Sequence, residues 1–100
     1  MPDRDQDPRA IASALLADTA AGAEEVAARE TRARHLVAQL APVETVLLEK
    51  LADGWSARDI ASVLGIAHTA YELHRASLFA KLDVGSTAAA VRIAVYAGLA

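Results

Sequence analysis

Residues 56–82 read SARDIASVLGIAHTAYELHRASLFAKL, and this stretch decides the fold of the surrounding domain. Ser56 suits the N-cap position of a helix, and Asp59 three residues later resembles a capping box in which Asp replaces the usual Glu. Gly65 interrupts the apolar pattern of this first segment, which then resumes at helical spacing from 67 to 82. Two helices joined by a short glycine turn, with the second helix longer, are typical of a helix-turn-helix motif.

The flanking sequence predicts one further helix on each side of this motif. Pro42 suits the first turn of a helix over 42–53, and Gly54 ends it. After the turn at 83–85, Ser86 is the expected N-cap of a helix over 87–97. With helices also expected at 57–64 and 67–82, residues 40–100 are predicted to form an all-α domain of four helices.

The segment before residue 40 is predicted to be a tail followed by one or two helices. Residues 1–7 alternate in charge with almost no apolar surface, which predicts a disordered tail. Pro8 suits the start of a helix over 8–21, and a second amphipathic helix is expected over 23–40, with Gly22 between them. Residues 8–39 are therefore interpreted as a helical linker or dimerisation segment.

Two apolar stripes are candidate dimer contacts. The first has heptad-like spacing and favours a coiled coil, although a helix folded back on its own domain fits the same pattern. The second stripe lies on the last helix, where it could form a dimer contact or close the core. If only one contact is used, we expect the first stripe, because an isolated helix of that length is marginal without a partner. The candidate dimerisation residues are Val26, Ala33, Val37 and Leu40 in the first stripe, and Val91 and Val95 in the second.

Composition and motifs limit the function classes. The chain has 100 residues and no cysteine, which fits a reducing cytoplasm, and its first residues do not resemble a signal peptide. No stretch of 18 apolar residues predicts a membrane span. The three histidines (His35, His68 and His74) fall on separate elements or faces, and no glycine-rich phosphate loop is present. We therefore expect no metal, no cofactor and no enzyme activity.

The strings Leu40-Ala41-Pro42-Val43-Glu44 and Leu51-Ala52-Asp53-Gly54-Trp55-Ser56 resemble the opening of LuxR/FixJ output domains. Further similarity lies at Arg58-Asp59-Ile60-Ala61, Leu64-Gly65-Ile66, Leu73-His74-Arg75 and Lys81-Leu82-Asp83-Val84, and it ends with Ser86 to Arg92. The resemblance covers about 60 residues without gaps, and it implies a bacterial helix-turn-helix transcription regulator that binds double-stranded DNA as a homodimer. We expect no receiver domain within these 100 residues.

The recognition helix departs from that family on its DNA side. The family commonly has S-x-x-T-V-K-x-H here, but this chain has Ala67, Ala70, Tyr71 and Glu72 at four of those places. Helical phase assigns Tyr71, Arg75, Leu78 and Leu82 to the core side, and Glu72, Leu73, Ala76 and Ala80 to the opposite side. That side is small, apolar and acidic, and the chain carries a net charge of −3. Because phosphate contacts by Lys and Arg supply much of DNA affinity, weak binding per protomer is expected.

The resemblance and the helical phase together define the candidate DNA contacts. These are Arg58, Thr69, Glu72, Leu73, Arg75, Ala76 and Lys81. The primary interpretation is a DNA-binding regulator of the LuxR/FixJ type. The alternative is a degenerate helix-turn-helix that binds, and thereby sequesters or adapts, another transcription regulator.

Overall fold

The computed structural model describes residues 22–100, which form five α-helices and, within that range, no strand. These are α2 (Gly22–Ala38), α3 (Pro42–Ala52), α4 (Ala57–Leu64), α5 (His68–Leu82) and α6 (Thr87–Ala97). The predicted all-α class is confirmed, and the helix bounds within 40–100 differ from the predicted ones by a single residue at most. The tail predicted over 1–7 and the helix predicted over 8–21 lie outside the described residues.

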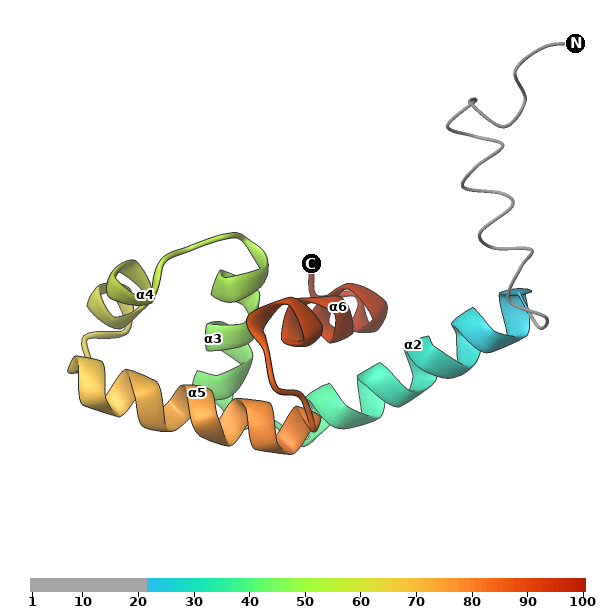
Figure 1. Ribbon diagram of the computed structural model, residues 1–100, viewed down its shortest axis with the longest axis horizontal. Helices are drawn as coiled ribbons and strands as arrows, with labels where there is room; N and C mark the ends of the chain where they lie inside the picture. Colours follow the sequence, from blue (N-terminus) through green and yellow to red (C-terminus); the bar gives the residue numbers. More distant parts are fainter. Residues whose placement is uncertain (1–21) are drawn as a thin grey trace, which may run out of the picture.

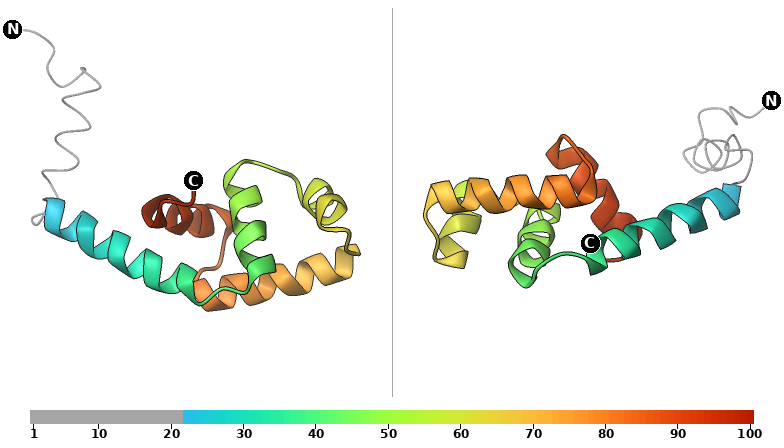
Figure 2. Two further views of the ribbon diagram at one scale, coloured as in Figure 1. Left: turned by 180° about the vertical axis from the view of Figure 1, so that it is seen from behind. Right: turned by 90° about the horizontal axis from the view of Figure 1, so that it is seen from below.

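Helices α3, α5 and α6 surround one core, with α4 closing it beside α5 (Figure 1). α5 runs along one side of the domain, and in the view from behind both α3 and α6 lie above it (Figure 2, left). Burial follows the apolar spacing of each helix. The largest fully buried side chains are Tyr71, Leu47, Leu48, Ile60, Leu78 and Leu82.

Left-handed residues end three of the helices. Gly65 ends α4 with φ 67° and Gly98 ends α6 with φ 81°, a conformation that glycine adopts without steric cost. α5 ends differently, because Asp83, and not Gly85, takes the left-handed conformation with φ 56°. The Val84 N–H then donates to the carbonyl of Phe79, so the chain turns sharply at the end of the helix.

Helix α2 packs on the domain through its C-terminal half, whereas its N-terminal half extends beyond the other helices (Figure 1). It lies mainly against α6, and Ala33 is buried. Leu36, Val37 and Leu40 pack against the domain core. Of the two arrangements that the sequence left open, packing on its own domain is observed for the C-terminal half of α2, and the coiled coil stays a prediction.

Burial within α5 predicts that substitutions of two leucines will have very different effects on the free energy of unfolding. Leu78→Ala is expected to lower the free energy of unfolding by about 2–5 kcal/mol, because the fully buried side chain leaves a cavity in a close-packed core. Leu73→Ala, in the same helix but at a side chain that is 73% exposed, is expected to change it by less than ~0.5 kcal/mol. Urea unfolding followed by circular dichroism measures both, and equal effects would contradict the described packing of α5.

Candidate nucleic-acid interface

The buried carboxylate of Glu44 joins α3 to α5. Glu44 is 2% exposed, and its two carboxylate oxygens accept three hydrogen bonds. Oε1 accepts from the Ala41 N–H at 2.7 Å and from the Lys81 ammonium at 2.6 Å, while Oε2 accepts from the Ser77 hydroxyl at 2.6 Å. One side chain therefore satisfies a free N–H at the start of α3 and holds two residues of α5.

Two opposing effects act on the ionisation of Glu44. Burial penalises the charged carboxylate and raises its pKa, but the hydrogen bonds from Lys81, Ser77 and Ala41 lower it by more. The resulting pKa is about 2, below the ordinary 4.5, so the carboxylate stays charged in the folded protein at neutral pH.

The two basic residues of α5 both contact other parts of the domain. Lys81, predicted to contact phosphate, is bound to Glu44, and its side chain remains 40% exposed. Arg75 lies over the Phe79 ring at 4.3 Å and donates to the Thr87 hydroxyl at 3.3 Å, which links α5 to α6. Arg75 therefore packs partly into the domain, and only Lys81 keeps a cation near the surface of α5.

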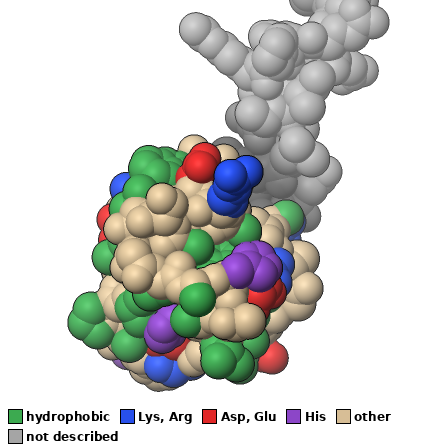
Figure 3. Space-filling view, turned by 90° about the vertical axis from the view of Figure 1, so that its left-hand side faces the viewer, with side chains coloured by type: hydrophobic (Ala, Val, Ile, Leu, Met, Phe, Trp, Pro, Cys, Tyr) green, Lys and Arg blue, Asp and Glu red, His purple; other side chains and the backbone are tan. Residues whose placement is uncertain are grey.

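The outward side of α5 carries the remaining candidate contacts on this helix. Thr69, Glu72, Leu73 and Ala76 are all exposed, as the helical phase predicted, and Leu73 is the most exposed large apolar residue of residues 22–100. His68 Nε2 lies 3.6 Å from Glu72 Oε1 at the start of the helix. On the end of the molecule that Figure 3 shows, hydrophobic side chains are scattered over the surface and basic ones form no continuous patch.

Arg58 is the candidate cation on the neighbouring helix. It is exposed in the first turn of α4, where the Ser56 hydroxyl caps the helix by accepting from the Asp59 N–H at 3.1 Å. No ion pair to Arg58 occurs within residues 22–100. Its guanidinium is thus available for a phosphate beside α5.

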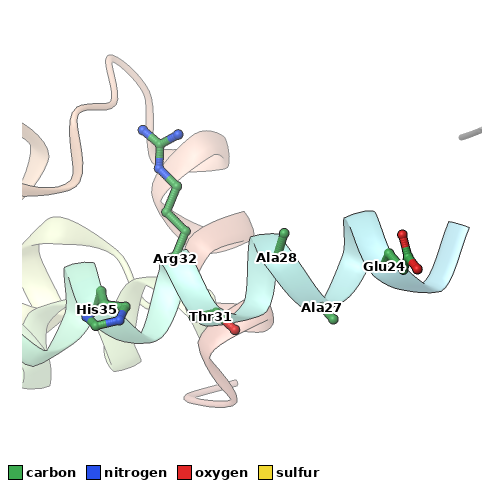
Figure 4. A pocket seen from close by; sticks show the side chains of 6 residues that line it. All are labelled: Glu24, Ala27, Ala28, Thr31, Arg32 and His35. Carbon is green, nitrogen blue, oxygen red and sulfur yellow. The ribbon is translucent and has the colours of Figure 1, made fainter. Parts of the chain in front are cut away.

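The six candidate dimerisation residues divide by exposure. Ala33 is buried and Val26 is half-buried, while Val37, Leu40 and Val91 pack against the domain core. Val95 is 58% exposed on α6. Most of the first predicted stripe is thus in contact with its own domain. The outer side of α2 instead presents small and polar side chains over a shallow hollow, lined by Glu24, Ala27, Ala28, Thr31, Arg32 and His35 (Figure 4).

Sequence reasoning missed the role of Glu44 and Ser77. Pro42 followed by Glu44 does predict a helix start, because a glutamate in the first turn can reach back to a free N–H. The partners Ser77 and Lys81 are 33 and 37 residues away, and no local pattern indicates them.

The described residues were also compared with the requirements of a metal site and of a membrane span. Within residues 22–100, no three His, Asp or Glu side chains are placed to hold a metal ion, and no helix is both long and apolar enough for a membrane span.

The short α4, the Gly65 turn and the longer, outward-facing α5 define a helix-turn-helix domain of the DNA-binding class. The model of the bacterial regulatory proteins of the luxR family matches residues 38–94, more than half of the chain. The chain belongs to this family, which confirms the resemblance seen in the sequence. No curated protein shows a significant match to it.

The hydrogen bonds of Glu44 predict a pH-dependent stability. Its folded pKa of about 2 is below the ordinary 4.5, so its stabilising effect is complete above about pH 4.5 and is lost as the pH falls towards 2. Glu44→Gln is expected to lower the free energy of unfolding by about 1–3 kcal/mol at pH 7 and to flatten its loss in acid. Urea unfolding at pH 7 and pH 3 measures this.

Glu49→Gln is the matched control, because Glu49 is exposed on the same helix. Its pH dependence should follow that of the wild type. An unchanged acid dependence in Glu44→Gln would show that the buried carboxylate does not link α3 to α5 in this way.

Proposed function

We propose that the chain is a transcription regulator that places α5 in the major groove of double-stranded DNA, with weak affinity per protomer. The observation that carries this proposal is the exposed side of α5, held on α3 by Glu44 in a domain of the luxR family. Arg58, on α4, and the exposed part of Lys81 are the proposed phosphate contacts.

The exposed side chains of α5 suit a limited set of base contacts. The Glu72 carboxylate can accept a hydrogen bond from cytosine N4, and Leu73 and Ala76 can contact a thymine methyl group. Thr69 can bind either a base edge or a phosphate. Glu72 also repels phosphate, and Arg75 is engaged by Phe79 and Thr87. These residues therefore support base contacts of this kind together with a weak electrostatic affinity for DNA.

A second candidate function rests on Leu73. Its side chain is 73% exposed at the centre of the outward face, with Ala76 and Ala80 beside it on the helix. Such a face supports close packing against another protein, and the candidate partner is a second transcription regulator. Leu73→Asp would abolish such a complex, because it would place a charge in a desolvated contact.

The DNA function predicts opposite effects for two charge changes. Arg58→Ala is expected to weaken binding to every duplex and to reduce the salt slope by about 1, because one phosphate contact is lost. Glu72→Lys is expected to tighten binding and to increase that slope, because an ammonium replaces a repelled carboxylate. Fluorescence anisotropy on a mixed-sequence duplex between ~50 and ~200 mM salt measures both.

Arg34→Ala is the control, since Arg34 is exposed on α2 and is not among the proposed DNA contacts. A wild-type protein without measurable DNA affinity at ~50 mM salt, with Glu72→Lys producing a binder, would contradict the primary function. Loss of a complex with another regulator on Leu73→Asp, in the same protein, would then establish the second one.

We also propose that the regulator acts as a homodimer through α6. Val95 is exposed on this helix, whereas most of the apolar stripe of α2 is in contact with its own domain. Val95→Asp is expected to convert a dimer into a monomer at ~100 μM protein, measured by sedimentation equilibrium. Val63→Asp, at a similarly exposed valine on α4, should leave the dimer intact. A monomeric wild type, or a dimer that survives Val95→Asp, would rule out this interface.

A further inference from the structure

A small groove lies on a different part of the domain from the outward face of α5. It is formed by α2, α6 and the chain that follows α5, and it encloses about 210 Å³. Its floor is apolar and is built from Leu36, Leu82, Val84 and Ile93. Leu82 is buried, whereas Leu36, Val84 and Ile93 are half-buried, so a ligand with an apolar body could cover what remains exposed of these three side chains.

Three arginines and one acid border this floor. Arg29 and Arg32 come from α2 and Arg92 comes from α6, while Asp83 is the acidic residue of the lining. Eight of the ten Lys and Arg residues lie in 22–100, and three of those eight line this one groove. The groove is thus a local concentration of positive charge in a chain whose net charge is −3.

The three guanidinium groups differ in their partners. Arg29 donates to Glu25 Oε1 at 2.7 Å, one turn earlier on the same helix. For Arg32 and Arg92, no carboxylate of residues 22–100 lies within ion-pair distance. Arg32 extends away from α2 with its guanidinium free of the helix surface (Figure 4). Both residues line the same groove from two different helices, so an anion could bind to either guanidinium without breaking an ion pair within this range.

We propose that this groove binds a small organic acid, with its carboxylate between Arg32 and Arg92 and its apolar body on the floor beneath them. Charge complementarity requires an anion, and guanidinium forks match the geometry of a carboxylate. The apolar floor requires a hydrocarbon body, which separates this ligand from the phosphates of duplex DNA. The volume is below the ~300–1,000 Å³ typical of drug-sized ligands, so the acid is short. The site is independent of DNA binding by α5.

Hexanoate is a suitable probe, with two matched compounds that each lack one of its features. Acetate keeps the carboxylate but lacks the apolar body, and hexanol keeps the body but lacks the charge. We expect hexanoate to shift the methyl resonances of Val84 and Ile93 in the full chain with a dissociation constant near ~1 mM. Acetate and hexanol should each bind at least ~10-fold more weakly, because each loses one of the two contacts.

Arginine variants assign the site. Arg32→Gln and Arg92→Gln should each weaken hexanoate binding by ~5- to 10-fold, because a neutral amide replaces a charge-assisted contact. Arg34→Gln is the control, since Arg34 is exposed on the same helix, donates to the Thr31 hydroxyl and does not line the groove. Circular dichroism confirms that each variant is folded before its titration.

Several results would overturn the proposal. One is the absence of a saturable shift at ~10 mM hexanoate, ten times the expected dissociation constant. Another is equal binding of acetate or hexanol, which would reduce the site to charge or to apolar surface alone. A third is hexanoate binding that Arg34→Gln weakens as much as Arg32→Gln does. Each of these outcomes leaves the DNA function of α5 unaffected.

Discussion

The arrangement of this domain depends on the Glu44 carboxylate, which is buried between α3 and α5 and accepts hydrogen bonds from three donors. A buried charge without such partners would be strongly destabilising, so the position of α5 on α3 is tied to the completeness of this network. Ser77 and Lys81 lie on the flank of α5 that meets α3, and both stay partly exposed. The side of α5 that carries the buried Tyr71 and Leu78 faces the core, and the helical phase then turns Leu73 outward. Glu44 thus fixes the place where α5 lies on α3, whereas burial of the apolar side of α5 decides which side of this helix faces outward.

The same network affects the chemistry that α5 can offer. The Lys81 ammonium is held by Glu44, and Arg75 is held between Phe79 and Thr87, so both cations of this helix contribute to the internal structure of the domain. An exposed cation would contact phosphate at little cost, whereas these two must weaken existing contacts to do so. This is why weak DNA affinity is proposed, with Arg58 of α4 and the exposed part of Lys81 as the phosphate contacts.

Helix α2 shows how packing changes the meaning of an apolar stripe. Its spacing alone fits a coiled coil as well as a helix folded back on its domain. In the structure, α6 presents the fully buried Ala90 and Ala94, and α2 has its most extensive contacts with α6. The short side chain of Ala33 allows a close approach there, so Ala33 is buried within its own domain. The same packing brings Arg32 and Arg92 to one groove although they are 60 positions apart.

The sequence by itself determined the elements that local physics controls. Helix ends follow from Ser56, Gly65 and Ser86, since caps and left-handed turns need only neighbouring residues, and the periodicity of α5 separates its buried side from its exposed one. Only the tertiary structure decided the rest: the link from Glu44 to Ser77 and Lys81, the hydrogen bond from Arg75 to Thr87 and the packing of α2. These contacts join residues on different helices, or they depend on which surface a helix meets. Neither kind of information can be read from the spacing of residues within one segment.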